Sequence, residues 1–362
     1  MDVIRQIADE IRSVEGVRLL NIDPGAAANR TVFTFVGSPA DVVEAAFRGA
    51  RAAARLIDMR RHQGTHPRIG ATDVLPLIPV SGITLEECAV LARQLAERMA
   101  RELDIPCYAY EASAFIPEHR NLAVCRAGEY EALERKLFTP GLQPDFIPAS
   151  VGNTPADIPE TVRRVGCSVV GARDFLIAVN FNLNTTSTQI ASAIACDVRE
   201  KGRPKRDDEG NPVLDADGNR VMIPGTLKCT KAIGWYIDEY GIAQVSMNMT
   251  NIHVTPLHAA YEEVCRCAQN RGVRVTGTEI IGLVPKQSLV DAGLYFLHKQ
   301  NHSEDIPEAE IIDTAIKSMG LDDLRPFNPR QKVIEYLMED TAPSAPTVAG
   351  GSPACVPACT PA

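Results

Sequence analysis

The second half of the chain carries six segments whose patterns follow one another in an order that few folds accommodate. In chain order they read as strand, helix, strand, strand, helix and strand, at residues 174–183, 186–201, 226–238, 242–249, 255–272 and 273–284. A capping box from Thr186 to Gln189 marks the first helix, and Pro256 opens the second. This β-α-β-β-α-β order is one of the compact α+β motifs and predicts one such unit here.

The first half repeats this order with its opening strand absent. Helix, strand, strand, helix and strand patterns lie at 3–13, 17–22, 31–36, 38–58 and 74–80, followed by a helix and a short strand at 84–104 and 107–110. In a sheet of this topology the absent strand would lie in the middle. We expect residues upstream of Met1 to supply it, which sequencing of the natural N-terminus would test. The predicted fold class is therefore α+β, with two β-α-β-β-α-β subdomains.

These patterns also predict the domain boundaries. We expect an N-terminal subdomain at residues 1–172, a C-terminal subdomain at 173–304, a group of helices at 305–340 and a tail at 341–362. The tail consists mainly of Pro, Ala, Ser and Thr without any periodic pattern. Because such a segment offers little apolar surface to bury, we expect the tail to be disordered.

Charge and hydropathy exclude several classes of protein. The 37 basic and 46 acidic residues give a net charge of −9, which argues against a nucleic-acid or anionic-membrane surface. No window has about 18 apolar residues in a row, so we expect no membrane span. The start, MDVIRQIADEIRSVEG, lacks a basic region before an apolar core and is not a signal peptide. The ten scattered cysteines fit a reducing cytoplasm.

The most polar internal stretch is residues 60–74, RRHQGTHPRIGATDV, between a long helix and a strand. His62 and His66 are the only residues there that exchange a proton near neutral pH. The stretch also holds groups that suit the binding of carboxylates or phosphates and the orientation of a histidine: Arg60, Arg61, Arg68 and Asp73. The sequence leaves two interpretations open, a site for chemistry and a solvated connector.

His66 is the better candidate proton carrier of the two histidines. Pro67 holds it in an extended or turn conformation, and Gly64 and Gly70 let the backbone bend around a ligand. A zinc site is the rival interpretation. His62 and His66 would bind one ion from a single helical face, but Gly64 and Pro67 disfavour a helix, so we expect no metal.

Two further segments carry candidate binding residues. Asp23, Asn29 and Arg30 lie around a tight turn, either on a solvated hairpin or facing the same site as the polar loop. Lys228 and Lys231 lie on a second-half strand with the only tryptophan of the chain. An aromatic ring beside lysines suits a flat anionic ligand such as a pterin with a glutamate tail, and the alternative is an ordinary strand.

Together these segments resemble glutamate formimidoyltransferase, the formiminotransferase portion of formiminotransferase–cyclodeaminases. Six blocks between Val3 and about Leu337 carry the resemblance: DPGAAANRTVFTFVG, RLIDMRRHQGTHPRIGATDVLPLIPV, CRAGEYEALERKL, GARDFLIAVNFNL, LKCTKAIGWYIDEYGIAQVSMN and GTEIIGLVP. The resemblance implies two ferredoxin-like subdomains with a substrate cleft between them, and a cytoplasmic homodimer. No cyclodeaminase domain follows, so that second activity is not expected.

The resemblance also implies a reaction and its residues. A formimino group moves between N-formimidoyl-L-glutamate and the co-substrate tetrahydrofolate in histidine degradation, without a metal. The family's catalytic histidine falls on the H-P-R motif, hence on His66. The implied folate segments contain Gly166, Gly171, Arg173, Gly225, Lys228, Lys231 and Gly234. The other candidate substrate or folate residues are Asp23, Asn29, Arg30, Arg60, Arg61, His62, Arg68 and Asp73.

The chemistry of an amidine carbon suggests how His66 would act. An amine attacks the formimino carbon, and a single imidazole near its usual pKa of about 6.5 can take one proton and return another. Asp73 or Asp23 would orient the ring, and the arginines would hold the glutamate carboxylates. Two alternatives remain: transfer of a formyl group from formyltetrahydrofolate to glutamate, and a folate-binding protein without turnover.

Overall fold

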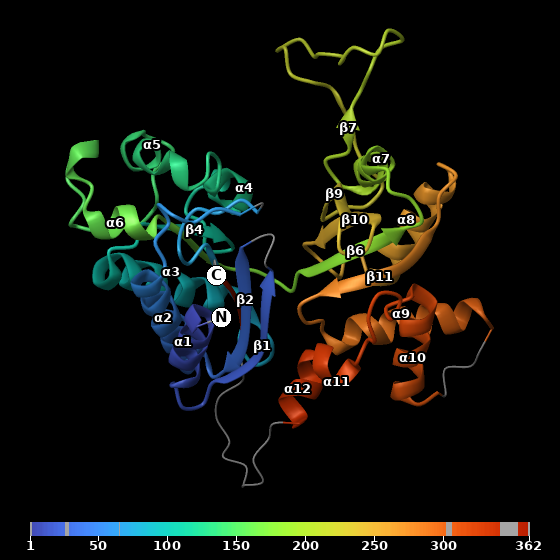
Figure 1. Cartoon of the computed structure of the whole chain (residues 1–362), viewed down its shortest axis with the longest axis horizontal. Helices are drawn as coiled ribbons and strands as arrows, with labels where there is room; N and C mark the ends of the chain where they lie inside the picture. Colours follow the sequence, from blue (N-terminus) through green and yellow to red (C-terminus); the bar gives the residue numbers. More distant parts are fainter. Residues whose placement is uncertain (1, 26–28, 65, 302–305, 341–353, 361–362) are drawn as a thin grey trace. The chain divides into compact units, whose positions relative to one another are not determined.

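The computed structural model describes residues 2–25, 29–64, 66–301, 306–340 and 354–360. The fold is mixed α/β with several sheets, and it divides into two compact units (Figure 1). The first unit comprises the chain up to Asp174 together with strand β12 (Ala354–Thr360), and the second begins at Phe175. The helices that follow residue 305 belong to the second unit, whereas the sequence placed them apart.

The first unit is built on a six-stranded sheet with the order β1-β2-β12-β3-β5-β4. Besides β12, its strands are β1 (Arg18–Gly25), β2 (Arg30–Gly37), β3 (Val74–Pro79), β4 (Cys107–Glu111) and β5 (Ser168–Ala172). β1 and β2 form an antiparallel hairpin, and β5 pairs in parallel with both β3 and β4. The sheet therefore changes from antiparallel to parallel pairing at β3.

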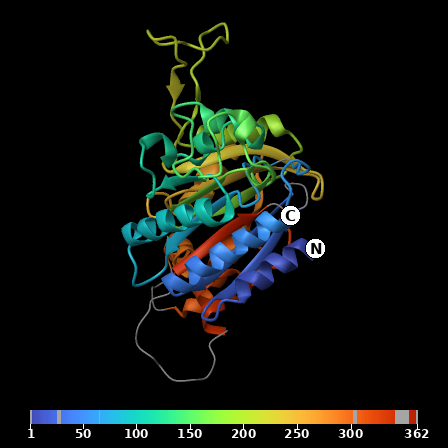
Figure 2. The same cartoon turned by 90° about the vertical axis from the view of Figure 1, so that its left-hand side faces the viewer.

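Three helices cover one face of this sheet: α1 (Asp2–Arg12), α2 (Pro39–Leu56) and α3 (Leu85–Leu103) (Figure 2). Their N-termini follow ordinary capping chemistry. The Ser38 hydroxyl accepts a hydrogen bond from the Asp41 amide, and Thr84 with Glu87 forms the predicted capping box. Apolar side chains of β2, β3 and β5 pack under these helices, and the sequence predicted the helices within a few residues.

Short helices cover the other face of the sheet at its β3-β5-β4 side. They are η1 (Pro117–Arg120), α4 (Leu122–Cys125), η2 (Tyr130–Ala132), α5 (Leu133–Phe138), η3 (Pro155–Asp157) and α6 (Glu160–Val165). A second core lies beneath them, in which Val169 of β5 packs. Its neighbour Val170 packs in the first core, so β5 is buried on both faces, as its continuous apolar run SVVGA requires.

Strand β12 lies in the middle of the first sheet, antiparallel to both β2 and β3. This is the place where the sequence lacked a strand, and we expected residues upstream of Met1 to fill it. β12 also departs from the disordered tail predicted for 341–362, of which 341–353 and 361–362 lie outside the described residues. Local composition could not reveal β12, because its backbone hydrogen bonds depend on strands more than 270 residues earlier in the chain.

The second unit has a four-stranded antiparallel sheet with the order β11-β6-β10-β9. Its elements are β6 (Ile177–Leu183), α7 (Thr188–Val198), β9 (Thr230–Ile237), β10 (Ile242–Met249), α8 (Leu257–Gln269) and β11 (Val275–Ile281). The predicted order of strands and helices is therefore observed. The N-cap of α7 is Ser187 rather than Thr186, because the Ser187 hydroxyl accepts the hydrogen bond from the Ile190 amide.

The remaining elements of the second unit are a hairpin and a group of helices. The hairpin strands β7 (Arg203–Pro204) and β8 (Met222–Ile223) pair with each other at the base of a long loop, which Figure 1 labels at β7. The helices are α9 (Lys286–Lys299), α10 (Glu308–Met319), α11 (Pro329–Lys332) and α12 (Ile334–Asp340). The sequence predicted one helix over 328–338. Val333 interrupts it, because its backbone pairs with Val284 instead.

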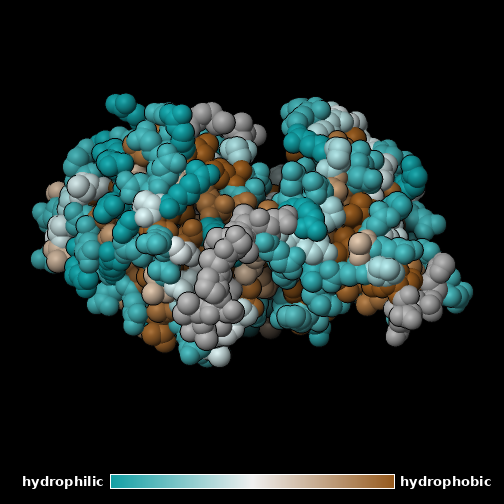
Figure 3. All heavy atoms as spheres, turned by 90° about the horizontal axis from the view of Figure 1, so that it is seen from below, coloured by the Kyte–Doolittle hydropathy of each residue, from teal (hydrophilic) through white to brown (hydrophobic). Residues whose placement is uncertain are grey.

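The face shown in Figure 3 is largely hydrophilic, with apolar side chains between the charged ones. Among the described helices, none has the length and apolar character that crossing a membrane demands.

Candidate active site

The polar loop at residues 60–73 is held in the first unit by two glycines. A Cβ on Gly70 would lie 2.0 Å from the carbonyl oxygen of Cys167, and a Cβ on Gly166 would lie 2.4 Å from that of Ile69. Gly166 also has φ +70°, a conformation that favours glycine. The Cys167 amide donates to the Ile69 carbonyl at 3.0 Å. Gly166 thus lets two backbone segments approach closely beside the loop.

His66 lies half-buried in this loop with both ring nitrogens in contact with polar groups. The Arg30 guanidinium lies against both nitrogens, and its Nη1 is 2.8 Å from Nε2. Nδ1 is 2.7 Å from the carbonyl oxygen of Pro67. Since a carbonyl only accepts hydrogen bonds, the contact with Pro67 favours a proton on Nδ1 and a lone pair on Nε2, while Arg30 Nη1 lies against both nitrogens.

Asp73, whose exposure is 0%, is the anionic centre of the site. Its Oδ2 is 3.2 Å from Arg30 Nη2 and also accepts from Arg126 Nη2, while Arg126 Nε lies 3.2 Å from Oδ1. The amide of Ile69 donates to Oδ1 at 2.9 Å. One carboxylate therefore holds two guanidinium groups, and positive charge remains next to His66.

These surroundings lower the pKa of His66 to about 4. Burial of the ring is the largest cause, and the charge of Arg30 is the second. The sequence-based mechanism assumed a pKa near 6.5, and the structure corrects this for the site without substrate. The imidazole is neutral at physiological pH, with the lone pair of Nε2 already occupied by a cationic donor.

No hydrogen bond joins Asp73 to His66 among the described residues; Asp73 contacts Arg30, and Arg30 contacts the ring. Asp23, the other carboxylate suggested to orient the ring, lies half-buried on β1, where it pairs with Val32 of β2. No side-chain hydrogen bond to Asp23 occurs in the described part of the chain.

His62 and Asn29 form hydrogen bonds between the polar loop and the β1–β2 turn. His62, 8% exposed, has Nε2 2.9 Å from the Asn29 carbonyl, and Asn29 Nδ2 donates to the Gln63 carbonyl at 2.6 Å. Burial lowers the pKa of His62. Its Nδ1 is buried without a hydrogen-bond partner within the described ranges. These contacts connect the β1–β2 turn to the polar loop.

The arginines of the loop differ in the ion pairs that they form with carboxylates of the chain. Arg68 is 7% exposed and donates to Glu131 at 2.6 and 2.8 Å and to Glu129 at 2.9 Å. Arg60 is bound to Asp58 and Glu160 at the surface. Arg61 is exposed and makes no side-chain hydrogen bond or ion pair with the described residues.

Arg126, Glu129 and Glu131 were not among the residues predicted from the sequence. All three follow α4 and lie some fifty residues or more beyond the loop they contact. The available signal was the block CRAGEYEALERKL, which begins at Cys125 and is one of the six that carry the family resemblance. The pairing of Arg126 with a buried Asp73 depends on the fold and is not visible in the residue pattern.

The predicted folate segment near residue 170 lies in and after β5. A Cβ on Gly171 would lie 2.3 Å from the Tyr110 carbonyl oxygen, so this glycine allows β4 to approach. Arg173 follows β5 and donates from Nη1 to the Asp174 carbonyl at 2.8 Å.

The second predicted folate segment belongs to the other unit. A Cβ on Gly225 would lie 2.1 Å from the Arg199 carbonyl oxygen, and a Cβ on Gly234 the same distance from the Ser192 amide nitrogen of α7. Both glycines therefore permit close backbone contacts within the unit. Lys228 and Lys231 are exposed.

One face of the second sheet carries a connected row of polar side chains. Trp235, 37% exposed, donates from Nε1 to Gln244 at 3.0 Å. Gln244 donates to Asn182 at 2.8 Å, and Asn182 donates to Asp323 at 3.1 Å. Lys231 lies two positions along β9 from Ile233 and four from Trp235, on the same face.

Family models match almost the whole chain. The model described as the N-terminal subdomain of the formiminotransferase domain matches residues 1–173, and the model described as the formiminotransferase domain matches residues 178–339. The chain belongs to the formiminotransferase family. The two matches meet between β5 and β6, where the structure also divides into its two units.

Curated relatives of this family have two lengths. The chain is 44% identical to the chicken (Gallus gallus) formimidoyltransferase-cyclodeaminase over 93% of this chain and 57% of that protein, and 43% identical to the pig (Sus scrofa) protein over 94% and 58%. It therefore spans less than two thirds of these relatives. It is 37% identical to glutamate formimidoyltransferase of Thermoplasma acidophilum over 84% of this chain and 90% of that protein.

Within the formiminotransferase domain, the cluster at His66 lies wholly in the part matched by the N-terminal subdomain model. Arg30, Asp73 and Arg126 contribute its charges. The polar row at Trp235 lies in the part matched by the second model.

Proposed function

We propose that this chain transfers a formimino group between N-formimidoyl-L-glutamate and tetrahydrofolate in histidine degradation, with His66 as acid/base catalyst. One observation carries the proposal: the neutral His66 ring is held by the Pro67 carbonyl, with Nε2 directed at a cationic cluster. The similarity to glutamate formimidoyltransferases over nearly their full length supports the choice of substrates.

The proposed reaction needs one group that both takes and gives a proton. An amine nitrogen of tetrahydrofolate attacks the formimino carbon, and its proton passes to Nε2 of His66. The bond from that carbon to the glutamate nitrogen then breaks, and the same proton passes to the departing nitrogen. Such proton transfer contributes roughly 10² to 10⁴ in rate.

Nε2 must first exchange its hydrogen bond with Arg30 for one with the attacking amine. A glutamate carboxylate offers Arg30 a stronger partner than a neutral imidazole does, because the hydrogen bond then joins two charges. Substrate binding would thus draw the guanidinium away from the ring. The loss of this nearby cation raises the pKa of His66, while burial of the ring, the larger cause, continues to lower it.

Binding of the substrates would use the other charged groups. We propose that Arg61, which pairs with no carboxylate among the described residues, and Arg30 bind glutamate, whereas Arg60, Arg68, His62 and Asn29 support the loop. Asp73 is the anchor for Arg30, and Asp23 lies on the neighbouring strand. Holding both reactants in position lowers the barrier by roughly 7 to 11 kcal/mol at best.

We propose that tetrahydrofolate, the co-substrate, contacts the segments 166–173 and 225–234. Arg173, Lys228 and Lys231 would bind its anionic tail, and Gly166, Gly171, Gly225 and Gly234 shape the backbone around them. The polar row at Trp235 offers amide groups and an aromatic ring to a flat heterocycle. No metal is part of this proposal.

The strand order supports a more specific description of the fold. We propose that both units are ferredoxin-like subdomains. In the second unit the motif β-α-β-β-α-β has the strands β6, β9, β10 and β11, and their order across the sheet is fourth, first, third, second (β11-β6-β10-β9). In the first unit β12 stands in the place of the first strand. We also propose that the protein works as a homodimer in the cytoplasm.

The test is an assay of the purified protein with N-formimidoyl-L-glutamate and tetrahydrofolate, in which 5-formimidoyltetrahydrofolate is measured. A parallel assay with formyltetrahydrofolate and glutamate tests the formyl-transfer alternative. Faster turnover with the formyl pair would overturn the proposed donor. Folate binding without turnover of either pair would identify a binding protein instead.

A further inference from the structure

Strand β12 lies between β2 and β3, the two strands next to the site, and pairs with both. The order β2-β12-β3 means that β2 and β3 do not pair with each other. β12 pairs with β2 along its whole length, from Ala354 opposite Gly37 to Thr360 opposite Thr31. On its other side, it pairs with β3 from Ala354 opposite Pro79 to Cys359 opposite Val74.

The end of β12 that includes Cys359 and Thr360 lies next to the two residues that organise the site. Thr31 directly follows Arg30, and Val74 directly follows Asp73. Adjacent strands lie about 4.8 Å apart, so β2 and β3 are separated by about 10 Å across β12. The 3.2 Å contact between Arg30 and Asp73 spans this separation. The position of Arg30 relative to Asp73 therefore depends on β12.

Two prolines indicate how β12 fits this place. Cys355 pairs with Ile78 and Cys359 with Val74, so the same register sets Pro357 opposite Pro76. The pairing with β3 is interrupted between these two points. Because proline has no N–H, the interruption leaves no unpaired backbone donor at Pro76 or Pro357.

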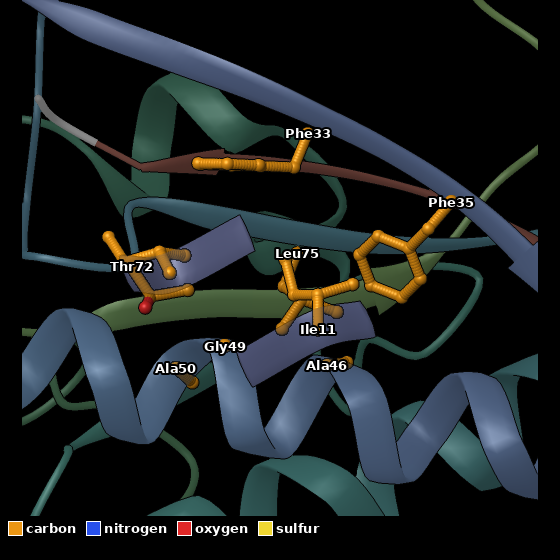
Figure 4. A pocket seen from close by; sticks show the side chains of 9 residues that line it. Ile11, Phe33, Phe35, Ala46, Gly49, Ala50, Thr72 and Leu75 are labelled. Atoms are coloured by element: carbon orange, nitrogen blue, oxygen red, sulfur yellow. The ribbon is translucent and has the colours of Figure 1, made fainter. Parts of the chain in front are cut away.

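A small cavity lies beneath this part of the sheet. It has a volume of about 10 Å³ and lies between the sheet and the helices, with room for about one water molecule. Phe33 and Phe35 of β2 and Leu75 of β3 line it from the sheet side, opposite α1 and α2 (Figure 4). Thr72 also lines it, and the Oγ1 atoms of Thr31 and Thr72 are buried without a hydrogen-bond partner within the described residues.

We propose that residues 354–360 form a positioning strand for the site: when β12 is seated it fixes β2 against β3, and with them Arg30 against Asp73 and His66. When β12 is unseated, β2 and β3 lose their common partner and Arg30 is no longer held at the ring. This inference rests on the proposed function for its catalytic consequence, but not for its structural one.

The experiment compares two full-length double variants. V356P/A358P removes two backbone N–H groups from β12 and disfavours the ladder. V356I/A358V changes the same positions to residues that favour strands and is the matched control. Amide hydrogen exchange is followed in residues 31–37 and 74–79, with residues 177–183 of the second unit as internal reference. The pKa of His66 is measured by NMR, and kcat and KM are measured for formimino transfer.

We expect the proline variant to lose protection in β2 and β3 by about tenfold or more while residues 177–183 stay protected. Its His66 pKa should rise by about one unit or more as Arg30 departs, and kcat should fall about tenfold or more. A synthetic peptide of residues 353–361, added under reducing conditions, should restore all three. The control variant should behave as wild type.

Three outcomes would overturn the proposal. One is unchanged protection of β2 and β3 in the proline variant, and another is lost protection with unchanged His66 pKa and kcat. The third is protection of β2 and β3 in the wild type that rises with protein concentration, since a second copy would then supply the strand. If wild type shows no turnover while protection and the His66 pKa respond as expected, the proposed function fails and the positioning role stands.

Discussion

Arg30 donates to His66 across 2.8 Å, so a permanent cation occupies the ring nitrogen that the proposed reaction needs. A neutral imidazole is a weak partner for a guanidinium, and a carboxylate is a strong one. In the proposed reaction, Arg30 would therefore both bind the glutamate carboxylate and, together with burial, keep the pKa of His66 low until glutamate binds.

Binding of glutamate should raise the pKa of His66. We expect a rise above the value of about 4 in the free protein, because Arg30 turns from the ring to the ligand carboxylate while the burial of the ring, the larger cause of the low value, remains. NMR titration of the His66 ring with and without saturating L-glutamate measures the shift. L-glutamine, which lacks the side-chain carboxylate, should produce a smaller one. An unchanged pKa with bound glutamate would contradict the exchange of Arg30.

Removal of the imidazole should slow turnover steeply. We expect H66A to lower kcat by roughly 10² to 10⁴, since the variant lacks the proposed proton carrier. H66Q is the control for shape and hydrogen bonding, and it should be nearly as slow because an amide does not exchange a proton at neutral pH. Folate affinity, measured by calorimetry, should remain close to that of wild type. Activity equal to wild type in H66A would refute the assignment.

The depressed pKa of His66 makes a predictable contribution to stability. Between about pH 6.5 and pH 4 the unfolded chain binds a proton at this residue and the folded chain does not, so the free energy of unfolding falls as the pH falls. The contribution lost is at most about 3 kcal/mol and is reduced by solvent at the half-buried ring. Urea unfolding of wild type and H66Q at pH 7 and pH 4.5 measures it. A wild-type-minus-variant difference that does not change with pH would contradict the depressed value.

Gly166 should be far less tolerant of alanine than another glycine with positive φ. G166A adds a Cβ 2.4 Å from the Ile69 carbonyl in a strained conformation, so we expect a loss of about 3 kcal/mol or more. G141A is the matched control, because Gly141 has φ +82° and no atom within 4 Å of the place that a Cβ would take, and it should cost only about 1 kcal/mol. Equal losses in thermal unfolding would show that the contact with Ile69 is not tight.

Trp235 offers an optical test of folate binding to the second unit. It is the only tryptophan of the chain and is 37% exposed. We expect tetrahydrofolate to quench its emission in a saturable way, and H66A to show the same quenching because His66 lies in the other unit. K231Q should weaken the apparent affinity. Saturable turnover without any change in emission would place the folate away from Trp235.

The sequence predicted the elements that depend on local patterns. The helix from Thr84 is an example, since its capping box and apolar period lie within its own residues. In the second unit the chain order is β6, α7, β9, β10, α8 and β11, with the short strands β7 and β8 between α7 and β9. The first unit shows the limit: β12 depends on partners far away in the chain, and a Pro- and Ala-rich segment carries no local sign of them.

Most residues of the candidate site could be predicted from the sequence, but only some of the contacts between them could. His66, Arg30 and Asp73 were singled out, and the structure brings them together. Arg126 was missed because its role follows from contact with a buried carboxylate. The pKa of His66 was also beyond the sequence, because burial and the approach of Arg30 are properties of the folded chain.

The place of β12 has a consequence for solubility. Residues 31–36 of β2, TVFTFV, are uncharged, without proline, and strongly disposed to pair as a strand. Without β12 they would present an open row of backbone donors and acceptors to any other chain, whereas β3 has Pro76 and Pro79 to discourage such pairing. A variant that cannot seat β12 should therefore aggregate through β2. The strand proposed to position the site would thus also cover the backbone groups of β2 and prevent their pairing with other chains.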